Sequence, residues 1–164
     1  MNDNYIVING KKIELTDEQV KALLVTVRKN PFEIVERGED YFYVNRYGDI
    51  NNSGQDDDSE DDCLFQAANY FNDESFAKQV ALQQLLYRKL LKFAYDNECE
   101  DTEEWYGRYL HWSIRYDECS NAFTTQNQIL YKSQEVYFSS EEGAKRAIKE
   151  VVEPFMKAHP DFIW

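Results

Sequence analysis

The sequence predicts an α+β fold, in which antiparallel strands pack against helices, and three observations lead to that prediction. Apolar residues alternate with a period of two after residue 40, as in a strand. They recur every three or four positions between residues 76 and 93, as in an amphipathic helix. Capping boxes precede two further apolar runs, which predicts where two more helices begin.

A single domain is expected, because 164 residues can form one hydrophobic core. Within residues 1 to 164 we predict three subregions. Residues 1 to 38 form an N-terminal hairpin and a helix. Residues 39 to 98 form a first repeat with a long helix, and residues 99 to 164 form a second repeat.

The N-terminal subregion begins with the β-branched segment YIVIN, which is typical of a strand. Gly10 supplies a turn, after which KKIEL can pair back as a hairpin. Thr16 and Gln19 form a capping box, so we expect a helix from Thr16 that ends before Pro31. Its apolar stripe consists of Val20, Leu23, Leu24 and Val27.

The first repeat is predicted to contain a strand, an acidic connector, a second strand and a helix. The strand DYFYVNRYGDI alternates until Gly48 breaks it. The segment CLFQAANYF, residues 63 to 71, is predicted to be its partner strand. A helix capped at Asn72 or Asp73 then runs to about Tyr95 and forms the centre of the core.

The second repeat follows the same order of elements. Strands are predicted for RYLHWSIRYD, for QNQILYK and for SQEVYF, which ends at Phe138. Ser139 and Glu142 form a capping box before a helix that Pro154 kinks or interrupts. We expect the C-terminal PDFIW to dock its three large apolar side chains on the body of the protein.

Two blocks of the chain resemble each other and indicate a duplication. NYFNDESFAKQ aligns with VYFSSEEGAKR at an offset of 67, and VNRYGD aligns with SIRYDE at an offset of 69. The acidic connector occurs in the first copy only. The matched residues favour a packing role: an aromatic pair ends a strand and a small residue lets a helix lie close to it. These pairs are Tyr70 with Tyr137, Phe71 with Phe138, and Ala77 with Ala144.

The net charge of −13 is concentrated in two short runs. Residues 56 to 62 and residues 96 to 104 each carry six carboxylates and no cation. Such a charge argues against direct binding to nucleic acid or to an anionic membrane and favours a protein partner with a basic surface. The candidate contacts are Asp56, Asp57, Asp58, Glu60, Asp61, Asp62, Glu100, Asp101, Glu103 and Glu104. Solvated loops are the alternative interpretation of both runs.

The sequence contains no recognisable catalytic or cofactor-binding motif, so we expect a protein that is not an enzyme and needs no cofactor. A calcium loop that starts at Asp56 would have Asp61 in place of the required glycine and Ala67 in place of the final acid. His111 lies inside an aromatic strand and His159 lies near the C-terminus, so we expect each to be packed or solvent-facing rather than catalytic. The three cysteines fit neither a disulfide framework nor a zinc site. A weak divalent-metal-dependent enzyme is kept as an alternative.

No apolar stretch is long enough to span a bilayer, and the N-terminal residues do not resemble a leader peptide. We therefore expect a protein that has no membrane contact and acts in the cytoplasm of a host cell.

Three segments, INGKKIELTDEQVKALL, NPFEIVERGEDYFYVNRYGDI and NYFNDESFAKQ, resemble small acidic proteins from phages and prophages of Firmicutes. VYFSSEEGAKRA is a weaker echo of the same group. That group includes inhibitors of type II CRISPR effector nucleases. The resemblance implies an anti-CRISPR protein that mimics DNA at a DNA-binding or PAM-reading surface. A phage accessory protein that binds another host factor or a virion component through its aromatic sheet face is the alternative, and the oligomeric state is left open.

Overall fold

The computed structural model describes residues 5–8, 10–20 and 30–164. It confirms the α+β prediction, with three two-stranded antiparallel sheets that pair β1 with β2, β3 with β4 and β5 with β6. The strands are β1 (Tyr5–Ile8), β2 (Lys11–Glu14), β3 (Asp40–Val44), β4 (Ile50–Gly54), β5 (His111–Asp117) and β6 (Ala122–Gln128). The helices are α2 (Ser59–Gln66), α3 (Glu74–Asp96), α4 (Glu141–Ala147), the π-helix η1 (Ile148–Val152) and α5 (Glu153–Ala158).

The N-terminal hairpin forms as predicted. Gly10 adopts a φ of +77°, the left-handed conformation that a tight hairpin turn requires. The capping box also forms, since the Thr16 N–H donates to Gln19 Oε1 and the Gln19 N–H donates to Thr16 Oγ1. The apolar positions Leu23, Leu24 and Val27 lie outside the described residues.

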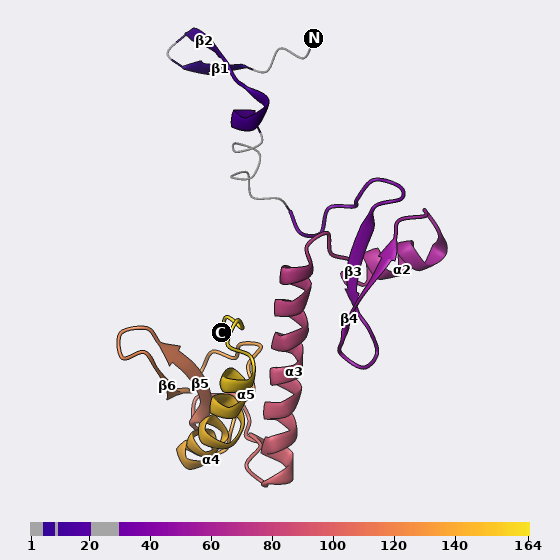
Figure 1. Ribbon diagram of the computed structural model, residues 1–164. Coiled ribbons are helices and arrows are strands. Elements are labelled where there is room, and N and C mark those ends of the chain that lie inside the picture. Colours follow the sequence, from indigo (N-terminus) through magenta and orange to yellow (C-terminus); the bar gives the residue numbers. More distant parts are fainter. Residues whose placement is uncertain (1–4, 9, 21–29) are drawn as a thin grey trace.

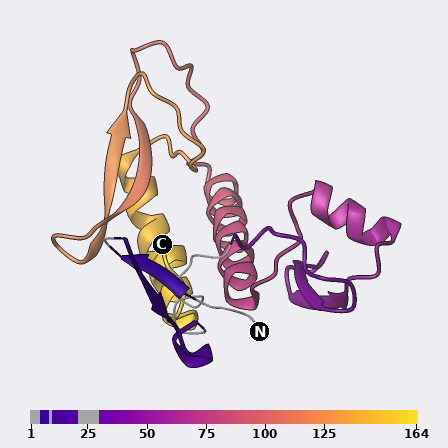
Figure 2. The same ribbon diagram turned by 90° about the horizontal axis from the view of Figure 1, so that it is seen from above.

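Helix α3 stands between two units, which Figure 1 and Figure 2 show on opposite sides of it. The first unit comprises residues 30 to 72 and contains β3, β4 and α2, and the second unit comprises residues 98 to 164 and contains β5, β6, α4, η1 and α5. Helix α3 begins at Asp73, whose carboxylate accepts a hydrogen bond from the Phe76 N–H. Leu82, Leu86 and Leu90 recur along its buried face and enter the main core.

In both units an aromatic residue from a later segment pairs with the first strand of the hairpin. In the first unit, Phe71 pairs with Phe42 of β3 through two backbone hydrogen bonds of 2.7 and 2.9 Å. In the second unit, Phe138 pairs with Trp112 of β5 through two bonds of 3.1 and 2.7 Å. Phe71 and Phe138 are both buried, and each immediately precedes a helix. This correspondence is compatible with the duplication that the sequence indicates.

Residues 63 to 71 are not the predicted partner strand. The first four residues of this segment belong to α2, because Asp58 caps a helix that starts at Ser59, and only Phe71 makes a bridge to β3. The partner of β3 is β4, a polar strand of sequence INNSG that lacks the alternation by which strands are recognised. Strand β6 contains the first three residues of the predicted strand QNQILYK, but it ends at Gln128, so the part from Ile129 onward does not form.

The C-terminal helix differs from the prediction in two details. Its cap is Ser140, whose hydroxyl accepts from the Gly143 N–H, one residue later than predicted. Ahead of Pro154, which has no N–H to donate, the backbone changes from α to π before α5 begins. In the C-terminal segment Phe162 is buried and Trp164 contacts Phe123, whereas Ile163 is 78% exposed.

Candidate functional site: an acidic face on the first unit

The first acidic run, residues 56 to 62, is the N-terminus of helix α2. The Asp58 carboxylate accepts hydrogen bonds from the Glu60 and Asp61 N–H groups, and Asp61 completes a capping box. Glu60, Asp61 and Asp62 occupy the first turn, where the helix dipole favours negative charge. The helix therefore tolerates a charge density that a strand connector would not.

Asp61 is the one member of this run that is buried. Its Oδ1 accepts a 2.8 Å hydrogen bond from the Tyr41 hydroxyl, and its Oδ2 accepts from the N–H groups of Asp56 and Asp58. Burial alone raises the pKa of Asp61, but these hydrogen bonds outweigh it and hold that pKa below its usual range. Burial also raises the pKa of Tyr41, as does its bond to this carboxylate. Asp61 is thus part of the fold and cannot contact a partner.

Three further carboxylates that the sequence analysis missed lie beside the exposed part of this run. The backbone of Gln55 bonds to both Gly38 and Glu39, which brings the loop before β3 against the start of the run. The same face includes Asp40, at the end of the hairpin where it pairs with Gly54. We call these exposed residues the acidic face: Glu36, Glu39, Asp40, Asp56, Asp57, Asp58, Glu60 and Asp62. Only the β3–β4 register, which the sequence did not predict, brings the two groups together.

The acidic face accounts for most of the excess charge. The first unit, residues 30 to 72, carries eleven acidic and two basic side chains, a net charge of −9, whereas residues 73 to 97 carry +1. One of the two cations, Arg37, lies 3.8 Å from Asp57, with both side chains exposed. An exposed pair of this kind is screened and contributes little stability, so the face keeps a strongly negative potential.

The second acidic run, residues 96 to 104, has a different structure. Asp101 is 4% exposed, and its Oδ2 lies 2.7 Å from Nδ1 of the fully buried His111. Glu100 is half-buried in a bridge to Phe138. Of the predicted contacts in this run, only Glu103 and Glu104 are exposed.

The two runs do not form one surface. They lie at opposite ends of α3, as Figure 1 shows. A helix of 23 residues is about 34 Å long, which is several times the distance over which exposed charges interact in physiological salt. The residues of the two runs therefore do not lie side by side, and the acidic face is the candidate site.

The His111 side chain is fully buried. The Trp105 ring stacks on the imidazole, with centroids 3.7 Å apart, and Nε2 has no hydrogen-bond partner. His159 packs against Phe155. Within residues 5–8, 10–20 and 30–164, no three His, Cys, Asp or Glu side chains are grouped so that they could hold a metal ion.

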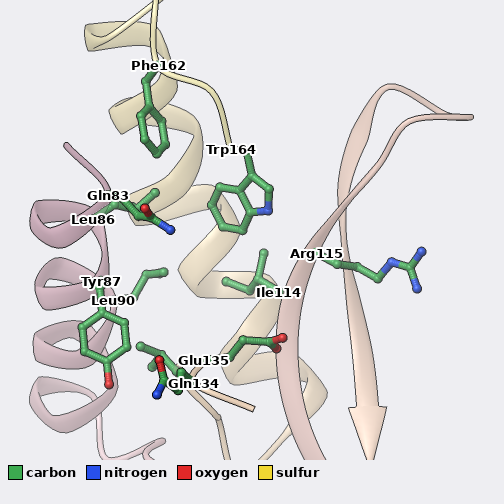
Figure 3. Close-up of a pocket in the computed structure, with 11 residues that line it drawn as sticks. Gln83, Leu86, Tyr87, Leu90, Ile114, Arg115, Gln134, Glu135, Phe162 and Trp164 are labelled. Carbon is green, nitrogen blue, oxygen red and sulfur yellow. The ribbon is translucent and has the colours of Figure 1, made fainter. Parts of the chain in front are cut away.

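An apolar cavity of about 290 Å³ lies between α3, β5 and the C-terminal segment. Figure 3 shows Phe162 and Trp164 on one side of it and Tyr87 on another, while the Arg115 guanidinium points away. Two leucines of α3, Ile114 and Val136 add apolar lining, while Gln83, Gln134 and Glu135 add polar side chains.

No protein family, no curated protein and no solved structure matches this chain. Among the described helices, none combines the length and the hydropathy needed to cross a bilayer.

Proposed function

We propose that this protein is a non-enzymatic inhibitor that binds a basic surface of a larger protein through its acidic face. The observation that supports the proposal is the concentration of eight exposed carboxylates on one unit, with Arg37 as the neighbouring cation. Proteins that bind DNA place Lys and Arg in a groove, and a protein that holds carboxylates on a firm scaffold can occupy that groove instead.

The scaffold of the acidic face is rigid. Helix α2 is capped at Asp58 and anchored through Asp61, which Tyr41 binds from the hairpin. Tyr41 in turn stacks on Tyr70 at 4.1 Å, and both rings are buried. Because the backbone that carries the carboxylates is held in place before binding, less conformational entropy is lost when a cationic partner is met.

The resemblance to acidic phage proteins suggests the partner. A type II CRISPR effector nuclease has a cationic channel for nucleic acid and a PAM-reading surface built from arginines. We propose that the protein acts as an anti-CRISPR inhibitor in the host cytoplasm by occupying such a surface in place of DNA.

A second candidate function rests on a different surface. Aromatic and aliphatic side chains of two neighbouring loops in the second unit are exposed, and Leu130 of one loop lies against Gly107 of the other. Exposed tyrosines are typical of protein interfaces. A phage accessory protein could use this surface for a host factor or a virion component. The residues are Tyr106, Tyr109, Leu110, Leu130 and Tyr131.

The test neutralises four carboxylates of the acidic face that do not cap helix α2. The variant D56N/D57N/E60Q/D62N keeps Asp58 and Asp61, so the hydrogen bonds that cap helix α2 are retained, and circular dichroism verifies that the helix is folded. The matched control, E98Q/E103Q/E104Q/E118Q, removes the same charge from exposed positions of the second unit. Cleavage of target DNA by a type II effector is measured with each protein added.

We expect the first variant to lose inhibition by at least about tenfold and the control to retain it, since each lost cationic contact weakens binding. Raising the salt from about 50 to about 500 mM should weaken the complex of the unmodified protein by orders of magnitude. Equal inhibition by both variants would exclude the acidic face as the binding site. An affinity that does not change with salt concentration would exclude charge mimicry. If the neutralised variant still binds the partner, and Tyr109→Ala and Tyr131→Ala abolish that binding, the aromatic surface would be favoured.

A further inference from the structure

Two arginines of this acidic protein line one cleft. Arg46 lies in the turn that follows β3, and Arg88 lies on α3. A cleft of about 630 Å³ opens between that turn, the segment from 67 to 69 and α3, and both arginines line it. Arg88 Nη2 would come within 3.6 Å of a side-chain carbon at Gly48, so its guanidinium lies against the turn that carries Arg46.

Among the described residues, these two arginines form no ion pair with a carboxylate, unlike some of the other cations. Arg37, Lys92, Lys145 and Arg146 each pair with an acidic side chain, whereas no such ion pair involves Arg46 or Arg88 in the part of the chain that the structure describes. A guanidinium presents a fork of N–H donors that matches the oxygens of phosphate.

The remaining lining suits an organic anion. Tyr47 is 73% exposed and has Arg46 over one face of its ring, 4.8 Å from the centroid. Most of the ring surface is therefore open to solvent, where a base can stack. Gln84 lines the cleft one helical turn from Arg88 and offers an amide donor and acceptor. A cleft of this volume holds far more than a single phosphate ion.

The positive site continues across α3. A second cleft of about 640 Å³ shares Gln84 and Arg88 with the first and adds Tyr87 and Lys132. The two clefts together are thus lined by three cations and two tyrosines, namely Arg46, Arg88, Lys132, Tyr47 and Tyr87. Glu135 is a carboxylate in the lining of the second cleft, and Asp49 follows the turn that carries Arg46.

The negative charge of the acidic face does not neutralise the positive potential of this cleft. It lies at the end of the β3–β4 hairpin where Asp40 pairs with Gly54, and Arg46 lies beyond the other end. Five residues of strand span about 17 Å, which exceeds the screening length of physiological salt.

We propose that this cleft binds a nucleoside polyphosphate, with Arg46 and Arg88 on the phosphates and the Tyr47 ring on the base. Stacking of a base on an exposed aromatic ring contributes affinity and orients the ligand, while the forked donors select phosphate over a neutral group. This inference is independent of the partner that the acidic face binds.

Isothermal titration calorimetry of the full chain in about 50 mM salt tests the proposal, with ADP, adenosine, inorganic pyrophosphate and a single-stranded oligonucleotide as probes. We expect ADP to bind, adenosine not to bind, and pyrophosphate to bind more weakly than ADP. The variant R46Q/R88Q should weaken ADP binding by about tenfold or more. The matched control R108Q/K157Q removes two exposed cations outside both clefts and should bind ADP normally.

Each opposite result overturns the assignment. No heat with ADP, or equal losses in the two variants, would show that the cleft is not an anion site. Pyrophosphate binding as tight as that of ADP would remove the contact between Tyr47 and the base. Tighter binding of the oligonucleotide than of ADP would mean that the ligand of the cleft is a nucleic-acid strand and not a nucleoside polyphosphate. The thermal unfolding temperature of R46Q/R88Q should equal that of the unmodified protein, which verifies that any loss of binding is local.

Discussion

The two units on either side of α3 share one packing device and differ in what surrounds it. In each unit a two-stranded hairpin receives an aromatic residue from a later segment, Phe71 on Phe42 and Phe138 on Trp112. The first unit inserts the acidic helix α2 between hairpin and aromatic residue, whereas the second joins them by the loop from 129 to 137. The paired aromatic residue is therefore the feature that the two units share, and it packs onto the hairpin in each. The segment inserted before it differs between the units and carries the charge in the first.

The largest expected effect is on the aromatic residue itself. Phe138→Ala should lower the free energy of unfolding by about 3 to 5 kcal/mol, because it opens a cavity in the main core. Phe71 is equally buried but lies outside that core cluster, so Phe71→Ala should lower stability less and chiefly loosen the first unit. Urea unfolding followed by fluorescence measures both. Equal effects would mean that the two units form one core.

A smaller effect is expected from the bond that anchors the acidic helix. Tyr41→Phe leaves the buried Asp61 without the hydroxyl donor and should cost about 1 to 3 kcal/mol. The control is Tyr43→Phe on the same strand, whose half-buried ring tilts against Tyr41. A loss of helical circular dichroism in Tyr41→Phe would locate the effect in α2, and unchanged unfolding of this variant would contradict the anchoring role.

The same carboxylate predicts a pH dependence. The pKa of Asp61 in the folded protein lies below its unfolded value, so its contribution to stability is present above about pH 4 and is lost as the pH falls through the folded-state pKa. Asp61→Asn should therefore flatten the fall in unfolding temperature on acidification. Asp73, Asp117 and Glu141 also have lowered pKa values from hydrogen bonds, so part of the fall remains. An acid profile identical to that of the unmodified protein would contradict the prediction.

A close approach in the second unit predicts a modest effect. Gly143 aligns with Phe76 of the first unit, and a Cβ at Gly143 would lie 3.0 Å from Cys99 Cβ. Gly143→Ala should destabilise by about 1 to 3 kcal/mol, since the backbone around Cys99 must shift. The neighbouring exposed substitution Glu142→Ala serves as control, and a neutral or stabilising Gly143→Ala would show that α4 can move away.

The smallest effect is on thiol reactivity. Burial raises the pKa of the Cys99 thiol, whereas Cys63 and Cys119 are exposed. Titration of the folded protein with an aromatic disulfide at neutral pH should show two fast thiols and one slow thiol. Three equal rates would mean that the interface between Cys99 and α4 opens readily.

Local signals were sufficient to predict several elements. The hairpin turn at Gly10, the capping box at Thr16 and helix α3 from Asp73 depend on contacts between residues a few positions apart, and each forms where it was predicted. The buried aromatic pairs were likewise visible, because Tyr70 and Phe71 match Tyr137 and Phe138 at a constant offset.

The candidate site was predicted only in part, and the reason is physical. The sequence determined that charge is concentrated near residue 56, since charge is a property of single residues. Only the tertiary structure decided that Asp61 and Asp101 are withdrawn into buried bonds, that Glu36, Glu39 and Asp40 join the face, and that the second run lies at the other end of α3. Such neighbours are set by strand register and helix length, which bring together residues that no local spacing relates.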